Sequence, residues 1–517
     1  MEVADDDNSH VTTKLRKRKA TSLDNSKAKN GKITSVKVTW KKCDKYVEKL
    51  PEDNPVPLAD AHPELIHKTP LDLFEQIFDY DSFESFKHQF ELYAHRDKNT
   101  PSFSTSHDEI QKYFGIILLS GYHCLPSERD YWSTADDLGC AIVPKVMSRN
   151  RFQEMKKITD FADNSNLAES KVAKVQPLYD QLNSALLQHG FFSCALSIDE
   201  SMVPYYGHHG AKMFIRGKPI RFRYKVWMLC GSDGYPYQAS VYCGKSDRPK
   251  SRSLGEHVVL EFAKLIPEKP KHQLFFDNFF TSYSLLHQLK ELGVRATGTV
   301  REGRLGTGRL PDKRAFTKAE RGKYEYTCDG EVCFVRWGDN NVVTCGSNYD
   351  TVLPVVKVER HVKGSRDKQK VSQPRMISKY VSGMGGVDLM DRLLSAYRPC
   401  IKAKKWWWNL FINAINMAVV AAWRIHCQVH ESSQTISHLE FRRELVLGLL
   451  KGSSRKRLGG PASPVPACVR FDGVEHYIES TTQGRCAECR KNTKKHCAKC
   501  EKGLHEHCFA LYHFKPQ

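Results

Sequence analysis

Two aspartates each follow a short, largely apolar run of the kind that forms a buried strand. Asp199 comes directly after residues 195–198 (ALSI), and Asp277 comes directly after residues 273–276 (QLFF). If these two strands are neighbours, both carboxylates converge at one edge of a sheet. Carboxylate oxygens are the hard ligands that Mg²⁺ prefers. Two such ions about 4 Å apart can hold the attacking and leaving oxygens of a phosphodiester, so the pattern indicates metal-dependent phosphodiester cleavage.

A third carboxylate is expected from a helical segment further along the chain. Residues 385–391 (GGVDLMD) carry Asp388 and Asp391 three residues apart, a spacing that places both on one face of a helix. Taken singly these signals are weak, because an aspartate after a strand more often begins a turn or caps a helix. Asp391 could also form a surface ion pair with Arg392 or Arg398. Only the combination of aspartates points to a metal site.

A second group of potential metal ligands lies in the last part of the chain. Two CxxC pairs, separated by seven residues, are followed by further cysteine and histidine. The seven candidate zinc ligands are Cys486, Cys489, Cys497, Cys500, His505, Cys508 and His513. With His496 or His507 as the candidate eighth, they indicate two cross-braced tetrahedral sites, and a single site is also compatible with the spacing. The zinc is expected to be structural, because a tail of roughly 30 residues cannot build a core alone.

The charge balance favours a polyanionic partner. The 517 residues include 79 Lys and Arg against 59 acidic residues, a formal net charge of +20. Each phosphate that a cation contacts releases condensed counterions, so nucleic acid is the expected partner. A soluble protein whose surface is merely basic is the alternative. The basic run at residues 14–19 indicates a nuclear import signal or a DNA-contacting arm, with a solubilising tail as the plainer interpretation.

The sequence shows neither a secretory signal nor a membrane span. The first twenty residues hold no apolar core segment. Residues 406–423 come nearest to a span, but Asn409, Asn413 and Asn416 interrupt them, which favours a buried helix. The 17 cysteines are therefore expected to be reduced thiols or metal ligands inside the cell.

The elements that must position the first two aspartates follow the order of an RNase H-like fold. Besides the two strands already named, strand-like runs cover residues 222–229 and 237–242. After Asp277 comes a helix that ends at Gly293, and residues 295–300 follow as a fifth strand.

The whole chain is expected to have an α/β fold divided into seven segments. They are a disordered basic tail (1–65), a helical dimerisation or DNA-binding domain (66–190), the first part of an RNase H-like catalytic core (191–300), a β-rich insertion (301–375), the helical last part of the core (376–450), a linker (451–483) and a cysteine-rich zinc-binding domain (484–517). Ser106 is the expected N-cap of one helix in the second segment.

Basic and aromatic side chains near the aspartates suggest contacts with DNA. The expected DNA-binding residues are Arg216, Lys218, Arg221, Arg223, Lys225, Lys404 and Lys405. A solvated strand face is the alternative for those around the second strand. At least two of the three tryptophans at 406–408 are expected in the core, because a helix cannot expose all three, and an exposed one could stack on an unpaired base. Residues 301–314 indicate either a DNA-contacting loop or an ordinary exposed one.

Four longer segments resemble the signature of piggyBac-type transposases and their domesticated relatives. They are residues 197–227 (SIDESMVPYYGHHGAKMFIRGKPIRFRYKVW), 274–286 (LFFDNFFTSYSLL), 384–398 (MGGVDLMDRLLSAYR) and 404–423 (KKWWWNLFINAINMAVVAAW). The resemblance covers roughly residues 70 to 517 in matching order. It implies an RNase H-like fold in which Asp199, Asp277 and Asp388 bind two catalytic Mg²⁺ or Mn²⁺ ions. Asp391 is similar to a further family position tied to activity.

The same resemblance implies the reaction and the partners. A cut-and-paste transposase frees a 3′-hydroxyl at each transposon end, forms and opens a hairpin, and joins the ends into a TTAA target. The expected partners are double-stranded DNA and a second copy of the chain, and the expected compartment is the nucleus. Asp199 would bridge both metals, Asp277 and Asp388 would each hold one, and Glu200 is expected to be structural. The family's cysteine-rich tail implies recognition of the transposon ends, with protein binding as the alternative.

Three other functions remain open at this stage. The first is a domesticated relative that binds DNA or chromatin without catalysis. The second is a nuclease on the same fold that does not join strands, and the third is a zinc-finger adaptor. Intact aspartates at 199, 277 and 388 favour the active transposase.

Overall fold

The computed structural model describes residues 39–216, 221–244, 249, 252–317, 319–361, 367–451, 470–471, 473–500 and 502–514. The chain forms two compact units, residues 1–452 and 453–517. The expected disordered tail falls largely outside the described residues, and so do the basic run at 14–19 and most of the expected linker.

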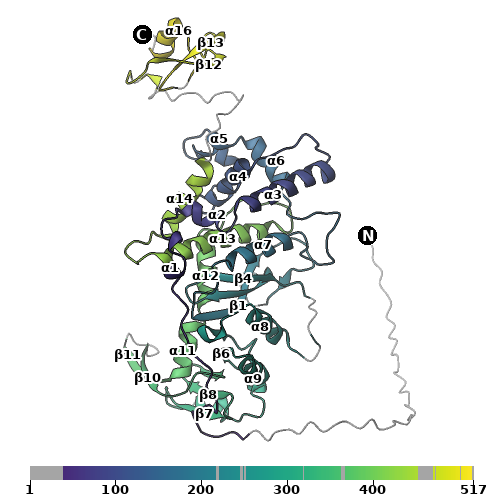
Figure 1. The fold of residues 1–517 in the computed structure, drawn as a ribbon, viewed down its shortest axis with the longest axis vertical. Helices are drawn as coiled ribbons and strands as arrows, with labels where there is room; N and C mark the ends of the chain where they lie inside the picture. The colour runs from purple at the N-terminus through teal and green to yellow at the C-terminus, as the bar shows by residue number, and fades with distance from the viewer. Residues whose placement is uncertain are drawn as a thin grey trace, which may run out of the picture. The chain divides into compact units, whose positions relative to one another are not determined.

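A nine-stranded sheet forms the centre of the first unit (Figure 1). Its strands are β1 (Ala195–Pro204), β2 (Met213–Phe214), β3 (Phe222–Gly231), β4 (Pro236–Val241), β5 (Gln273–Phe276), β6 (Arg295–Thr299), β7 (Tyr324–Cys328), β8 (Cys333–Gly338) and β9 (Val342–Ser347). The order is β2-β3-β1-β5-β6-β9-β8-β7, with β4 also paired to β3. Strands β1, β3 and β4 are antiparallel, whereas β1, β5 and β6 are parallel. This arrangement confirms the RNase H-like core.

All five strands expected around the aspartates are present. The expected run at 273–276 coincides with β5, whose four residues are all buried. Parallel strands that are covered on both faces carry continuous apolar runs, which is why this short strand could be recognised. The expected turn after β3 is also present, where Gly234 has a positive φ of 86°.

One helix next to the site was not predicted. Helix α8 (Leu254–Lys264) lies between β4 and β5 in the chain, and α9 (Tyr283–Glu291) follows Asp277 as expected. The start of α8 carries a capping box, in which Ser253 accepts from the Glu256 backbone N–H and the Glu256 side chain accepts from the Ser253 N–H. A serine three residues before a glutamate, followed by apolar residues, is a helix-start signal that was available in the sequence.

The expected β-rich insertion does not form a separate sheet. Strand β9 pairs antiparallel with β6, and β8 and β7 follow in order, so these three strands extend the central sheet. Only β10 (Val355–His361) and β11 (Lys368–Pro374) form a sheet of their own. Extending the sheet covers the edge of β6, which would otherwise expose unpaired backbone groups.

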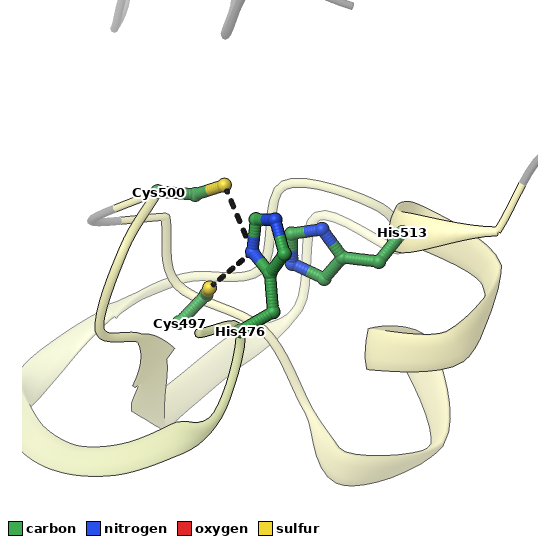
Figure 2. A group of neighbouring side chains, drawn as sticks. All are labelled: His476, Cys497, Cys500 and His513. Atoms are coloured by element: carbon green, nitrogen blue, oxygen red, sulfur yellow. Dashed lines mark hydrogen bonds between the residues drawn. The ribbon is translucent and has the colours of Figure 1, made fainter. Parts of the chain in front are cut away.

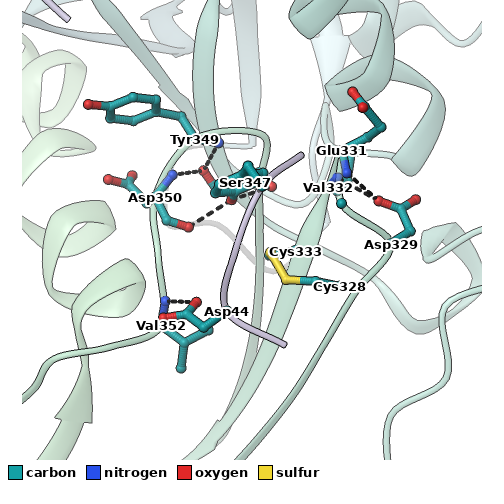
Figure 3. Close-up of a disulfide and its surroundings, with 12 residues drawn as sticks. Asp44, Cys328, Asp329, Glu331, Val332, Cys333, Ser347, Tyr349, Asp350 and Val352 are labelled. Atoms are coloured by element: carbon teal, nitrogen blue, oxygen red, sulfur yellow. Dashed lines mark hydrogen bonds between the residues drawn. A yellow bond between two sulfur atoms is a disulfide. The ribbon is translucent and has the colours of Figure 1, made fainter. Parts of the chain in front are cut away.

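Residues 39–56, here called the N-terminal strap, were expected to be disordered but are held against β7, β9 and the loop after β9. The backbones of Lys41 and Cys328 exchange two hydrogen bonds of 2.8 Å. The Asp44 carboxylate accepts from the backbone N–H of Val352 at 2.6 Å (Figure 3). The Tyr46 hydroxyl donates to the carbonyl of Asp350 at 2.8 Å. The strap is polar, so its composition resembled a disordered tail, but it is held by backbone and side-chain partners far away in the sequence.

Two cysteines expected to be reduced are joined in the structure. A disulfide connects Cys328 at the end of β7 to Cys333 at the start of β8, beside the strap (Figure 3). The two residues face each other in the β7–β8 register. Among the described residues the other cysteines form no disulfide.

Helices cover the sheet and build the rest of the first unit (Figure 1). They include α1 (Leu58–Ala61), α2 (Pro70–Glu75), α3 (Tyr80–Leu92), α4 (His107–Leu119), α5 (Val143–Val146), α6 (Arg149–Ile158), α7 (Gln176–Leu186), α10 (Lys313–Thr317), α11 (Arg375–Gly383), α12 (Gly386–Ala396), α13 (Trp408–Val429) and α14 (His438–Lys451). Ser106 caps α4 by accepting from the Glu109 N–H. Helix α13 contacts α2, α7, α12, α14 and β1, so it joins the first helices to the sheet.

Helix α13 is the long apolar segment noted in the sequence. It is long and apolar enough to cross a membrane, but 83 % of its most apolar stretch is buried inside the protein. Its asparagines are part of this core: Asn416 donates to the Leu394 carbonyl at 2.9 Å and accepts from Arg442 at 2.5 Å. Buried amides with protein partners suit a core helix.

The second unit is a small folded module. It contains β12 (Ile478–Arg485), β13 (Asn492–Cys497) and α16 (Glu506–His513). Strands β12 and β13 pair antiparallel. Four of its cysteines are buried together with Leu504 and Tyr512. The ordered part therefore begins before residue 484, the start that was expected.

Candidate active site and metal centres

The first two aspartates lie side by side on neighbouring strands. In the parallel pairing of β1 with β5, Ile198 lies beside Phe276. Asp199 directly follows Ile198 in the sequence, and Asp277 directly follows Phe276. Asp277 begins a tight turn, in which its carboxylate accepts from the Phe279 N–H at 2.7 Å and its carbonyl accepts from the Thr281 N–H at 3.2 Å. The strand pairing thus brings the two carboxylates to one point, as the sequence predicted.

Helix α12 brings the third aspartate to the same place. Asp388 lies in the first turn of α12, which packs against β1 and β3. The helix starts close to the sheet, because the Ser197 hydroxyl accepts from the Val387 N–H at 3.2 Å. A Cβ atom on Gly386 would lie 2.2 Å from the Gly231 carbonyl oxygen and 2.5 Å from the Ser197 hydroxyl. Only glycine allows this approach, which explains the second glycine of the GGVD pattern physically.

The electrostatics show that the other two carboxylates lie close enough to act on Asp199. Burial is the largest of the effects that raise the pKa of Asp199 to about 8; the negative charges of Glu200, Asp277 and Asp388 add to it, and a hydrogen bond from the Glu200 N–H opposes it. Asp388 itself is exposed to solvent. Such a group of oxygen ligands, exposed to solvent at Asp388, suits a divalent cation. The described residues therefore fit the implied metal by the chemistry of their donors.

Glu200 has a different partner. Its carboxylate lies 3.8 Å from the Lys225 ammonium on β3, the strand next to β1. This ion pair agrees with the structural role expected for Glu200.

Asp391 lies one helical turn beyond Asp388 but is bound differently. Its carboxylate accepts from the Ser201 hydroxyl at 2.5 Å. Burial raises its pKa, and although the Ser201 hydrogen bond and the charge of Arg398 oppose this, the pKa remains raised, at about 6. The surface ion pair considered from the sequence is therefore not its main contact. Asp391 ties α12 to β1, and Arg398 and Arg223 lie near enough to act on its charge.

Four of the expected DNA-binding residues are accessible at least in part. Arg216, Arg221 and Lys404 are exposed, and Arg223 is half-buried. Lys218 lies outside the described residues.

Lys225 does not fit that expectation. Its side chain is only 9 % exposed and lies over the rings of Trp227, at 4.3 Å, and Phe279, at 5.1 Å. Alternation along β3 suggested an exposed face, but β3 is an interior strand between β1 and β4, so neighbouring side chains cover it.

Lys405 is also structural. Its ammonium donates to the carbonyls of Lys157 at 2.8 Å and Thr159 at 2.6 Å, at the C-terminal end of α6. Helix C-termini favour such cations. Burial lowers the pKa of Lys405 to about 7. Its role is to join α6 to the segment before α13.

The tryptophans next to Lys405 behave as expected. Trp407 and Trp408 are buried, with exposures of 3 % and 0 %. Trp406 is half-buried and stacks on His209 with ring centres 3.7 Å apart. The expected loop at 301–314 is partly bound to the site, because Arg304 donates to the Phe279 carbonyl at 2.5 Å.

The C-terminal module holds two groups of four potential metal ligands. Within each group the ligand atoms lie within 4.8 Å of one another. One group is Cys486, Cys489, His505 and Cys508, and the other is His476, Cys497, Cys500 and His513. Figure 2 shows the second group, with the His476 ring between the two cysteine sulfurs. The groups alternate along the chain, which is the cross-braced arrangement expected from the spacing.

The eighth ligand expected from the sequence was wrong. His496 lies 3.8 Å from the Glu479 carboxylate, and the His507 ring packs beside that of His505. The eighth member of the groups is His476, in the segment expected to be linker. No short spacing marks His476, because the fold rather than the local sequence brings it to Cys497.

Although burial opposes it, hydrogen bonds from neighbouring backbone N–H groups lower the pKa of Cys486 to about 6. The thiolate is the form that binds metal. Both groups match the cysteine and histidine donor sets of structural zinc.

Comparisons with known proteins agree with this architecture. The sequence model of a family described as "Transposase IS4" matches residues 69–423. The chain is 35 % identical to human "PiggyBac transposable element-derived protein 3" over 476 residues, which cover 89 % of this chain and 79 % of the relative. It is 34 % identical to human "PiggyBac transposable element-derived protein 2" over 460 residues, covering 86 % and 76 %.

A solved structure has the same fold. The structure titled "Cryo-EM structure of piggyBac transposase synaptic complex with hairpin DNA (SNHP)" matches with a TM-score of 0.62 and 20 % sequence identity. The match covers 88 % of this chain and 97 % of that one.

Proposed function

Because the chain belongs to the piggyBac-type transposase family, we propose that it is a DNA transposase that excises an element and joins it into TTAA target sites. Asp199, Asp277 and Asp388 are its metal ligands. The observation that supports this most directly is the convergence of the three carboxylates: Asp277 and Asp388 lie close enough for their charges to act on Asp199, whose pKa is raised mainly by burial.

Divalent metal ions at these carboxylates, Mg²⁺ or Mn²⁺, would activate water and the 3′-hydroxyl and stabilise the charge on the transferred phosphate. The chain's own part is to hold the ligands in place. The β1–β5 register sets Asp199 beside Asp277. The contact of Gly386 with β3 sets the start of α12. Asp391 fixes the same helix to Ser201, so we assign it a positioning role.

Several surfaces are proposed to bind DNA. Arg216, Arg221 and Lys404 are exposed cations on segments that flank the carboxylates in sequence. Cations on such a surface neutralise phosphates and release counterions. The two cysteine and histidine groups would hold two structural zinc ions, and the module they fold would recognise the transposon ends. The chain would act as a homodimer that holds both transposon ends and forms through the helical segment at 66–190. It would be located in the nucleus.

A second function is supported by the human relatives, whose names describe them as transposable element-derived. In that case the chain is a domesticated protein that binds DNA or chromatin without transposition. The carboxylates favour the active enzyme, because nothing in a DNA-binding role alone requires three carboxylates to converge in a half-buried site.

An excision and integration assay in cells separates the two. It uses a reporter flanked by the terminal repeats of the element that encodes this chain, with Asp277→Ala as the matched inactive control. Scarless excision and TTAA insertion that are lost in the control support the transposase. Absence of both products, with nuclear, folded protein and intact repeats, supports the domesticated function. Loss of strand joining in Asp199→Ala or Asp388→Ala with DNA binding retained would extend the assignment to all three ligands.

A further inference from the structure

The N-terminal strap places a tryptophan beside the loop that follows β6. The Trp40 ring lies between Tyr283 of α9 and Phe334 of β8, with ring centres 5.7 Å and 5.6 Å away. Its indole N–H donates to the Thr307 hydroxyl at 2.9 Å. The paired backbones of Lys41 and Cys328 fix the position of the strap at this point. Trp40 is therefore anchored on three sides by parts of the chain that are distant in sequence.

Residues 301–308, here called the 301–308 loop, connect Trp40 to the turn that carries Asp277. At the start of the loop, Arg301 donates to the Asn278 side-chain oxygen at 2.7 Å. Arg304 donates to the Phe279 carbonyl at 2.5 Å. Asn278 and Phe279 are the two residues after Asp277. The Asp277 carboxylate accepts a hydrogen bond from the backbone N–H of Phe279. The loop thus holds the metal-ligand turn at its first end.

The sequence of the 301–308 loop gives its backbone a large conformational freedom. It contains Gly303, Gly306 and Gly308, and Gly306 has a positive φ of 64°. Glycine lowers the cost of such a turn but increases the number of conformations available to a free loop. Its order depends on its contacts, which include the two arginines and the ion pair of Glu302 with Arg336 at one end, buried Leu305 in the middle, and the Trp40–Thr307 hydrogen bond at the other.

We propose that Trp40 is a positioning residue for the active site: through Thr307 and the 301–308 loop it fixes the orientation of the Asp277 carboxylate. The inference rests on the proposed function, since it makes Asp277 a metal ligand. It also assigns a task to the strap, which no catalytic motif includes. Groups that orient a ligand from outside the metal's own shell typically change metal affinity by about 10- to 100-fold when removed.

The test uses the full-length protein and two measurements. The first is amide hydrogen exchange at Phe279, Phe280 and Thr281, whose N–H groups bond to Asp277. The second is the affinity for Mn²⁺, measured by electron paramagnetic resonance, at the site that Asp277→Ala abolishes. Trp40→Phe keeps the stacked ring and loses the N–H donor, and Thr307→Val removes the acceptor. Trp423→Phe is the matched control, a half-buried tryptophan of α13 that donates to the Ile436 carbonyl at 3.1 Å.

Each of the two single variants is expected to speed exchange at the three amides and to weaken Mn²⁺ binding by about 3- to 10-fold. The double variant should be no worse than the stronger single one, because both remove the same hydrogen bond. Trp423→Phe should change neither quantity. Unchanged exchange and unchanged Mn²⁺ affinity in folded Trp40→Phe and Thr307→Val overturn the proposal. If the unsubstituted protein binds no Mn²⁺ through Asp277, the proposed function fails, and exchange at the turn still decides whether Trp40 orders it.

Discussion

The Ser201 hydroxyl donates to the Asp391 carboxylate at 2.5 Å, across 190 positions of sequence. Ser201 lies on β1 two residues after Asp199, and Asp391 lies on α12 three residues after Asp388. One hydrogen bond therefore links the strand that carries the first proposed ligand to the helix that carries the third. The relative position of the two ligands depends on it.

Removing this bond should loosen the site. Ser201 is only 2 % exposed, so Ser201→Ala leaves the half-buried Asp391 carboxylate without its nearest donor, at a cost of about 1–3 kcal/mol. Ser395→Ala, an exposed serine of the same helix, is the control and should cost nothing measurable. Urea unfolding followed by tryptophan fluorescence measures the difference. All 8 tryptophans lie in the first unit, so the signal is specific to it. Equal stabilities for the two variants would contradict the role given to this bond.

Substitution by alanine should have very different effects on stability at the adjacent glycines Gly385 and Gly386. Gly386→Ala places a methyl group 2.2 Å from the Gly231 carbonyl oxygen, so α12 must move away from β3. Overpacking of this kind costs about 1–3 kcal/mol and should also displace Asp388 and weaken Mn²⁺ binding. At Gly385 an added Cβ meets nothing within 4 Å, so Gly385→Ala is the matched control. Similar unfolding midpoints and Mn²⁺ affinities for both variants would show that the close approach of α12 does not matter.

Local sequence patterns were sufficient for some of the fold and not for the rest. Strand β5 and the first part of β1 were recognisable because buried parallel strands carry apolar runs, whereas β1 continues past Asp199 to Pro204, which the sequence did not predict. The extension of the sheet by β7–β9 could not be predicted from the sequence, because the pairing between β6 and β9 joins residues that are about 50 positions apart. Local pattern carries little information on such pairings.

The same distinction applies to the site. The three aspartates could be named from their motifs, whereas the exposure of a lysine depends on what the fold places over it. Lys225 was assigned to DNA from strand alternation and is covered by Trp227 and Phe279. His476 was missed because its partners Cys497 and Cys500 lie more than 20 positions away.

The zinc content should identify the true eighth ligand. The full-length protein should bind two zinc ions, and His476→Ala should lose or weaken one of them, because three ligands remain in its group. His507→Ala is the control and should retain both. Zinc is measured by atomic emission after gel filtration. Two tightly bound ions in His476→Ala, or one in His507→Ala, would contradict the cross-braced assignment.

A histidine in α13 should make the first unit sensitive to acid. His426 is 8 % exposed, and its Nε2 accepts from the Ile436 N–H at 3.3 Å, which requires a neutral ring nitrogen. Burial, followed by the nearby His430, lowers the pKa of His426 to about 4. Below the ordinary histidine pKa of about 6.5, His426 binds a proton in the unfolded chain but remains neutral in the folded protein. The free energy of unfolding should therefore fall as the pH drops from about 6.5 to about 4.

At pH 5 this loss should be about 1–2 kcal/mol relative to pH 7.5. His426→Gln keeps an acceptor but does not titrate, so its loss over the same range should be smaller. Fluorescence-monitored urea unfolding of both proteins at the two pH values gives the difference. Identical losses in the two proteins would show that His426 does not titrate as its burial implies.

The most direct test of the central claim is strand transfer with purified components. Full-length protein, two pre-cut element ends and a supercoiled target are incubated with Mg²⁺, and the joined products are counted and sequenced. The proposed function predicts products joined at TTAA that require Mg²⁺ and fall by at least about 10³-fold in Asp277→Asn, with end binding retained. Joined products that persist in Asp277→Asn, or end binding without any joined product from the unsubstituted protein, would contradict it.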